Sequence, residues 1–313
     1  FKSFLKLLAD SKIDVKPLIS HRFKFEKALD GYLEVQNPEA LGIVLNYPQQ
    51  VISKNDDGYS LVRSLQLSLP SKVNQSEVIV GVIGAGNYAG QVLLPALKAT
   101  EARLKMIVSA GGINGTYHGR KLGFEFSSTL IENILEDDEI NLVLISTRHN
   151  LHSSLVKKVL ESGKNVFVEK PLCINKNELL ELESYISNNN PKGFLMVGFN
   201  RRFAPHIVKM KELLSTVAEP KALVMIVNAG YIPEQHWTQD PEIGGGRIIG
   251  ESCHFIDLLR FLVGEKIVEV SSNAMSECNT PSDTVTIQIT FSDGSIGTVH
   301  YFANGNKKYP KER

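Results

Sequence analysis

Two glycines stand two residues apart where an apolar segment gives way to a helical pattern. Segment 84–89 reads Gly-Ala-Gly-Asn-Tyr-Ala and follows the apolar residues 79–83. Gly84 permits a tight turn, Gly86 lets the backbone approach a pyrophosphate, and Ala89 stands where a third glycine would pack helix on strand. The positive end of the following helix favours phosphate. A glycine turn without a ligand is the alternative, but this context predicts dinucleotide binding by Gly84, Ala85, Gly86, Asn87 and Tyr88.

The next predicted strand, residues 103–110, ends without the carboxylate that usually binds the adenosine ribose. Ser109 is the polar residue at its end, and a hydroxyl can bond a ribose but cannot repel a 2′-phosphate. Arg120 or Lys121 would be able to meet such a phosphate, although a solvated surface is the simpler role for both. The cofactor is therefore expected to be NAD or NADP, with the choice open.

Polar side chains also cluster where a later apolar strand, residues 140–147, meets its helix. The carboxyl edge of an open α/β sheet is where ligands bind. Helix capping or packing is an equally good role for each histidine here. The candidates to line the nicotinamide side are Thr147, Arg148, His149 and His152.

Lys170 follows directly on the short apolar segment 165–168, between Glu169 and Pro171. At the end of a strand in the same sheet, a lysine can bond a substrate hydroxyl and stabilise the alkoxide formed as hydride leaves. An ion pair with Glu169 is the alternative, but adjacent strand residues point to opposite faces. We predict that Lys170 is catalytic, that Pro171 restrains the peptide that orients it, and that Glu169 contacts the cofactor.

A histidine with a carboxylate on either side lies on one stripe of the helix expected after Gly244-Gly245-Gly246. Glu251, His254 and Asp257 recur three residues apart, and the apolar residues between them form the buried face. The pattern fits a proton acceptor with an orienting carboxylate. It equally fits a structural histidine near a helix start whose ring nitrogens are hydrogen-bonded.

Composition excludes several classes of protein. The 313 residues hold 34 basic and 34 acidic residues, so no net field attracts nucleic acid or an anionic membrane. The three cysteines have no metal-ligand spacing, which predicts no metal site and fits a reducing, cytoplasmic setting. Residues 78–97 carry no charge but are interrupted by glycine and proline, so we do not expect a membrane span.

The elements that position these residues fall into four predicted segments. Residues 1–46 carry two helical patterns, over 1–13 and 21–35, and a closing strand at 42–45; residues 47–76 read as a linker or covering segment. Residues 77–195 alternate apolar strands with amphipathic helices, including one that starts near Asn150 and stops at Gly163, which predicts a doubly wound parallel sheet. Residues 196–313 predict an α+β unit with a mainly antiparallel sheet and a hairpin at 292–294.

Together, the segments GVIGAGNYA, GKNVFVEKPL, VGFNRRFAP and GGGRIIGESCHFIDLLRFLVG resemble the Gfo/Idh/MocA oxidoreductase family from about Val78 onward. The resemblance implies a Rossmann domain, a C-terminal domain whose open sheet often forms a homo-oligomer interface, and hydride transfer between NAD(P) and a sugar-like CH–OH. It also implies catalytic roles for Lys170 and His254. The family commonly has an aspartate at the position of Gly250, so Glu251, one residue later, becomes the candidate carboxylate.

Residues 1–45 are similar to the C-terminal end of a zinc-type, medium-chain alcohol dehydrogenase, so the chain resembles a fragment of a bi-domain oxidoreductase. The resemblance implies a bacterial surface-polysaccharide pathway.

The sequence as a whole predicts an oxidoreductase in which His254 removes a hydroxyl proton and Lys170 stabilises the alkoxide. Its substrate is expected to be a sugar, sugar nucleotide or polyol, bound by Asn200, Arg202 and Asp257, with Arg201 as a further candidate. Two alternatives remain open at this point: an NAD-dependent glycosidase that uses the redox step transiently, and a non-catalytic dinucleotide or sugar sensor.

Overall fold

The computed structural model describes residues 2–10, 12–46, 63–68, 78–277, 280–306 and 308–312. The chain divides into two compact units, Phe1–Leu61 and Val62–Arg313. Each unit is described by itself below. Most of the segment expected to be a linker, residues 47–76, lies outside the described residues.

The first unit holds a two-stranded parallel sheet with short helices. Helix α1 spans Lys2–Ala9, strand β1 His21–Lys24, helix α2 Ala28–Glu34 and strand β2 Ile43–Asn46, with β1 parallel to β2. The prediction of one helix over residues 21–35 was wrong for its first part. Burial alternates along β1, as suits a strand paired on one side, and the helix starts only after the 3-10 turn Phe25–Lys27.

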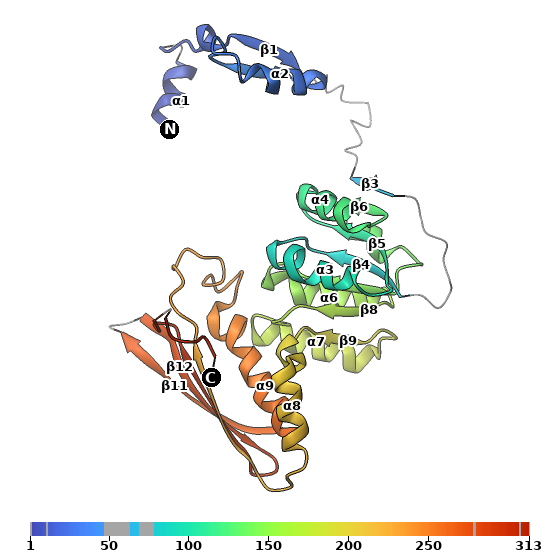
Figure 1. The fold of residues 1–313 in the computed structure, drawn as a ribbon, viewed down its shortest axis with the longest axis vertical. Coiled ribbons are helices and arrows are strands. Elements are labelled where there is room, and N and C mark those ends of the chain that lie inside the picture. The colour runs from blue at the N-terminus through green and yellow to red at the C-terminus, as the bar shows by residue number, and fades with distance from the viewer. Residues whose placement is uncertain are drawn as a thin grey trace. The chain divides into compact units, whose positions relative to one another are not determined.

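The second unit begins with a seven-stranded sheet in the order β3-β6-β5-β4-β7-β8-β9 (Figure 1). All neighbouring pairs are parallel except β3 with β6. The strands are β3 Ser64–Gln66, β4 Ile79–Ile83, β5 Arg103–Val108, β6 Phe126–Ser128, β7 Leu142–Ile145, β8 Asn165–Val168 and β9 Leu195–Val197. The doubly wound parallel sheet predicted from the sequence is confirmed, and β3 adds an antiparallel edge strand from within the segment expected to be a linker.

Helices cover both faces of this sheet, and each face has its own apolar core. They are the π-helical turn Ala89–Leu93 with α3 Leu94–Lys98, then α4 Ile113–Leu122, α5 Glu132–Leu135, α6 His152–Glu161 and α7 Lys176–Asn189. Every residue of β4 is buried, which explains why the strand reads as an unbroken apolar run. The chain order reverses at β4, which lies between β5 and β7, and such a switch point is where open α/β sheets bind ligands.

Helix α6 starts slightly later than predicted. A 3-10 turn spans His149–Leu151 and the α-helix begins at His152, without a side-chain cap from Asn150. Its end agrees with the prediction, because Gly163 follows the helix with a φ of 77°, a conformation that glycine adopts at little cost.

The rest of the unit is a four-stranded sheet, in the order β10-β13-β12-β11, that carries two helices on one face (Figure 1). Strand β10 pairs in parallel with β13 and the other pairs are antiparallel, as predicted. The strands are β10 Ala222–Asn228, β11 Ile267–Glu277, β12 Thr280–Phe291 and β13 Ile296–Phe302, and the helices are α8 Pro205–Leu214 and α9 Cys253–Val263. The expected hairpin turns at Gly294.

Candidate functional site

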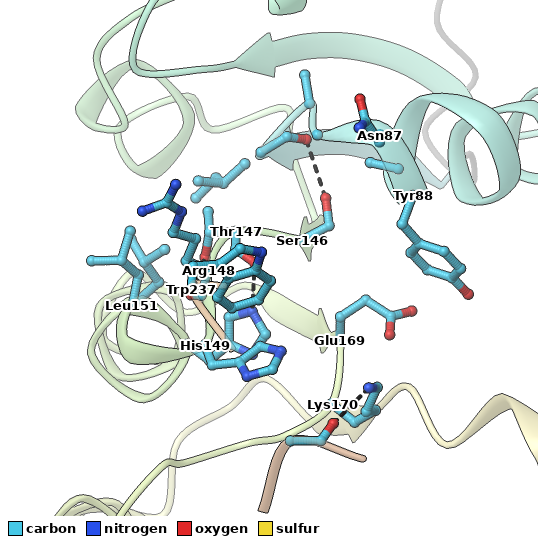
Figure 2. Close-up of a pocket in the computed structure, with 18 of the residues that line it drawn as sticks. Asn87, Tyr88, Ser146, Thr147, Arg148, His149, Leu151, Glu169, Lys170 and Trp237 are labelled. Atoms are coloured by element: carbon cyan, nitrogen blue, oxygen red, sulfur yellow. Dashed lines mark hydrogen bonds between the residues drawn. The ribbon is translucent and has the colours of Figure 1, made fainter. Parts of the chain in front are cut away.

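A cleft of about 1760 Å³ lies along the carboxyl ends of β4, β5, β7 and β8. One wall is formed by the Rossmann sheet, and the other by the start of the four-stranded domain and the turn before α9. Figure 2 shows Asn87 and Tyr88 from the glycine turn, Thr147 and His149 from the end of β7, and Lys170 after β8 around the same space. Residues predicted from three separate stretches of sequence therefore meet in one site.

The glycine turn has the geometry that a dinucleotide requires. Gly84 has a φ of 105°, and a Cβ there would lie 2.6 Å from the carbonyl oxygen of Ser146, so only glycine fits. Ser146 in turn donates its hydroxyl to the Gly84 carbonyl at 3.1 Å. A Cβ at Gly86 would meet no atom within 4 Å, which leaves its backbone open to a pyrophosphate. Ala89 is buried where helix and strand pack.

Ser109 lines the cleft at the end of β5 and also stabilises the following helix. Its hydroxyl oxygen accepts the backbone N–H of Gly115 at 3.0 Å, and the hydroxyl hydrogen remains available to a ligand. Among the described residues that line the cleft, the carboxylates are Glu169 and Glu251, and neither is at this end. Arg120 and Lys121 line a neighbouring surface depression, which shares Gly111, Ile113 and Thr129 with the cleft.

The two histidines after β7 are buried and bonded to backbone. His149 Nδ1 lies 2.8 Å from the Gly244 carbonyl oxygen, and burial lowers its pKa to about 4. His152 Nδ1 lies 2.7 Å from the carbonyl oxygen of Pro171 and its Nε2 3.2 Å from that of Thr147. His152 thus joins the end of β7 to the turn that carries Lys170, and it also lines the cleft, as predicted.

Lys170 points into the cleft and donates its Nζ to the Gly250 carbonyl oxygen at 2.7 Å (Figure 2). Within the described part of the chain, no ion pair joins Lys170 to Glu169, although both side chains line the same cleft and do not lie on the opposite faces that were expected. Burial raises the pKa of Glu169, and its carboxylate faces the cleft near Tyr88. The lysine amine therefore remains available to a ligand.

His254 lines the cleft at the start of α9, close to Lys170. Burial and the positive charges of Lys170 and Arg201 lower its pKa to about 3, so the imidazole is neutral at physiological pH. The ring packs edge-on against Phe199, with centroids 6.0 Å apart. Its Nδ1 is buried and has no hydrogen-bond partner among the described residues.

The two carboxylates expected beside His254 bind other groups. Glu251 accepts hydrogen bonds from the Tyr301 hydroxyl at 2.5 Å and the Lys311 amine at 2.6 Å, and it pairs with Arg247 at 3.3 Å. Asp257 is buried and forms a two-pronged ion pair with Arg202. In the structure, neither carboxylate orients His254.

Of the residues expected to bind the substrate, some line the cleft and others do not. Because Arg202 and Asp257 bind each other, neither lines the cleft, whereas Arg201 does. Asn200 lines it too and donates to the Tyr88 hydroxyl at 3.2 Å, so the pair links the glycine turn to the second domain.

The cleft also has lining residues that the sequence analysis did not single out, among them Trp237, Arg247 and Lys311. The indole of Trp237 lies edge-on to His149 at 4.8 Å between ring centroids, with the guanidinium of Arg148 5.8 Å from its ring (Figure 2). Arg247 and Lys311 reach the site through Glu251. Arg247 follows the three glycines directly, which was the available signal; Trp237 and Lys311 lie in segments without a regular pattern.

Within the described ranges, no group of histidine, cysteine and carboxylate side chains is arranged to hold a metal ion. In the same ranges, no helix combines the length and the apolar character of a bilayer span.

Comparison with known proteins places both domains in one family. Residues 78–199 match the model described as the oxidoreductase family, NAD-binding Rossmann fold, of Gfo/Idh/MocA proteins, and residues 209–312 match the Gfo/Idh/MocA C-terminal domain.

Among curated relatives, the chain is 26% identical over 228 residues to 1,5-anhydro-D-fructose reductase of Ensifer adhaerens, covering 70% of this chain and 68% of that one. It is 28% identical over 188 residues to myo-inositol 2-dehydrogenase of Thermotoga maritima, covering 57% and 54%. This chain therefore spans about half to two thirds of the length of these relatives.

A crystal structure of a probable dehydrogenase from Thermotoga maritima superimposes with a TM-score of 0.64 and 25% identity, covering 73% of this chain and 69% of that one. The fold, the geometry of the glycine turn and the two family-model matches all indicate the same family. Residues 78–312 belong to the Gfo/Idh/MocA family of NAD(P)-dependent oxidoreductases.

Proposed function

We propose that the chain transfers hydride between a nicotinamide cofactor and a CH–OH group of a sugar, sugar nucleotide or polyol, with Lys170 and His254 at the reacting oxygen. The single observation that carries this proposal is that Lys170 and His254 face one cleft together with the open glycine turn. The names of the two curated relatives, a reductase of a sugar derivative and a dehydrogenase of a cyclitol, support the substrate class.

The residues present fit a dinucleotide along the cleft. Gly84, Gly86 and Tyr88 would hold the pyrophosphate, and Ser109 would bond the adenosine ribose. Thr147, Arg148 and Glu169 would surround the nicotinamide end, where the bound cofactor supplies hydride acceptance or donation. Asn200 and Arg201, across the cleft, would contact the substrate.

Lys170 contributes an ammonium group in a partly dehydrated site, where a charge acts on a developing alkoxide more strongly than in water. The Gly250 carbonyl holds the amine in place through a bond of 2.7 Å. His254, neutral and at the same end of the cleft, supplies a second polar contact to that oxygen.

The test compares Lys170→Ala with the wild type in two assays. We expect dinucleotide affinity to change by less than about threefold and kcat to fall by roughly 10²–10⁴-fold, the usual loss for an acid–base group. Lys176→Ala, an exposed lysine at the start of α7, is the control. Intact turnover in the Lys170→Ala variant, with cofactor still bound, would disprove the assigned role. A redox-neutral release of a sugar leaving group would instead favour the glycosidase.

We also propose that residues 1–46 are the C-terminal tail of a zinc-type, medium-chain dehydrogenase domain, in a bi-domain oxidoreductase. The support is physical: α2 exposes Leu29, Tyr32 and Leu33 by 80%, 72% and 73%, and parallel sheets such as β1–β2 are normally covered on both faces. Hydrogen exchange in this chain should then be fast throughout α2. Slow exchange there would show that the unit is stable without further structure.

A further inference from the structure

The tautomer of His254 decides what this histidine can do. A neutral imidazole donates through one ring nitrogen and accepts through the other. To accept a hydroxyl proton at the nitrogen facing a substrate, the ring must carry its own proton on the far nitrogen, and a general-base histidine normally bonds that proton to a carboxylate or carbonyl. The surroundings of Nδ1 therefore decide between a base and a donor.

Nδ1 of His254 is buried and has no acceptor within hydrogen-bonding distance in the described part of the chain. Glu251, three residues before it, is bonded to Tyr301 and Lys311, and Asp257, three residues after it, is bonded to Arg202. The position one helical turn earlier is Gly250, which has no side chain to offer.

The other groups that face the ring do not supply an acceptor either. They are the cations of Lys170, Arg201 and Lys311, which affect its charge, and the hydrocarbon ring of Phe199. The Gly250 carbonyl is occupied by the Lys170 amine. A proton on Nδ1 would thus be a buried N–H without a partner, an arrangement that is rare in proteins.

We propose that His254 is neutral with its proton on Nε2, and that it acts in this site as a hydrogen-bond donor to the substrate oxygen instead of as the general base. The inference rests on the proposed function and refines the roles within it. Since His254 lines the cleft and its buried nitrogen is Nδ1, Nε2 is the nitrogen left for a ligand. Neutral histidines with lowered pKa values act as donors to a carbonyl in other enzymes.

Proton transfer then falls to Lys170. In the direction of reduction, the carbonyl carbon gains hydride and the electron pair of the C=O π bond moves to oxygen. The Lys170 ammonium gives that oxygen its proton, becomes an amine and regains a proton from solvent. The Nε2–H of His254 stays in place and stabilises the negative charge that develops on the oxygen. Oxidation follows the same steps in reverse, with the Lys170 amine as the proton acceptor.

The direct test is a long-range ¹H–¹⁵N correlation spectrum of the whole chain labelled at histidine, which distinguishes the two neutral tautomers and the imidazolium. His254→Gln, or His254→Asn if the first variant does not fold, identifies the His254 signals among the eight histidines. We expect the Nε2–H form to persist from about pH 5 to 9. An Nδ1–H form, or an imidazolium in this range, overturns the proposal.

A second test compares His254→Gln with His254→Ala in the reduction of the ketose or cyclitol ketone that the wild type reduces, with NADH or NADPH as the hydride donor. Glutamine retains an N–H donor but is no base, so we expect its kcat to stay within about tenfold of wild type. His254→Ala should lose about 10²–10³-fold, the usual effect of removing one such donor. Equal losses in both variants would restore the general-base role.

The two claims fail in different ways. If neither NADH nor NADPH binds, or if no carbonyl compound is reduced, the proposed oxidoreductase function is disproved, while the tautomer spectrum, which needs no cofactor or substrate, still decides the state of His254.

Discussion

Three charged side chains of the cleft, Arg247, Glu251 and Lys311, are bonded to one another, and Glu251 shows the consequence for a single residue. Burial alone would raise the pKa of its carboxyl group, but hydrogen bonds from Lys311 and Tyr301, with the charges of Lys311 and Arg247, outweigh burial and lower it to about 2. Glu251 therefore stays ionised at every physiological pH. Such a group is poorly suited to exchange protons and well suited to hold the two cations in place.

Glu251→Gln should lower the free energy of unfolding at pH 7 by about 2 kcal/mol, a value discounted because the carboxylate is partly exposed. The folded-state pKa lies below the usual value of 4.5, so this stabilisation is present above about pH 4.5 and disappears as the pH falls towards 2. Urea unfolding at pH 7 and pH 3.5 measures the difference. Glu212→Gln, on an exposed pair, is the control. If the free energy of unfolding of the wild type exceeded that of Glu251→Gln by the same amount at both pH values, the lowered pKa of Glu251 would be wrong.

At the scale of elements, the turn between β4 and the following helix has two glycines with different roles: one is needed for folding and the other for ligand binding. Gly84 is required by the fold, because its backbone is left-handed and its Cα faces the Ser146 carbonyl. At Gly86 the protein itself leaves room for a side chain. The missing side chain therefore leaves space for a ligand to approach the backbone. The pair allows folding and binding to be tested separately.

Gly84→Ala should destabilise the domain by more than about 1 kcal/mol and prevent dinucleotide binding, because alanine is strained at this φ and its Cβ overlaps a carbonyl. Gly86→Ala should keep the wild-type melting temperature to within about 2 °C but weaken dinucleotide binding by at least about tenfold. Thermal unfolding and calorimetric titration of both variants supply the measurements. Unchanged affinity in Gly86→Ala would mean that the turn is only structural.

The sequence predicted the strands and helices that carry this site better than the contacts between its side chains. Buried parallel strands such as β4 and β8 read directly as apolar runs, and Lys170 and His254 followed from their places beside such elements. The partners of Glu251 did not, because Tyr301 and Lys311 lie 50 and 60 residues away in the chain. Strand β1 was missed because four residues next to a helical pattern do not establish a period of their own.

At the scale of the whole molecule, one face of the four-stranded sheet is covered by α8 and α9, while no helix of the described residues covers the other face. Residues Val299 and Tyr301 of β13 point into the core, and the intervening positions face outward. The outward face carries apolar residues, including Val224, which is 65% exposed, and Ile296. We propose that this face joins copies of the chain into a homo-oligomer, because exposed apolar patches on a sheet commonly mark an interface.

Val224→Lys should shift the chain to monomers in light scattering after size exclusion, because a charge cannot be buried unpaired in an apolar interface. The fold should survive, since the side chain is exposed in one copy. Val208→Lys, an exposed position on α8, is the matched control and should leave the assembly unchanged. A Val224→Lys variant with the wild-type mass would rule out this face as the interface.

Calorimetric titration of the whole chain with NAD⁺, NADH, NADP⁺ and NADPH, after any cofactor carried through purification has been identified, decides whether the chain binds a nicotinamide cofactor. We predict micromolar binding of one oxidised and reduced pair at the glycine turn, lost in Gly86→Ala. The pair that binds also shows whether Ser109 accommodates a 2′-phosphate. No binding of any of the four to a folded sample would contradict the proposed oxidoreductase function of this chain.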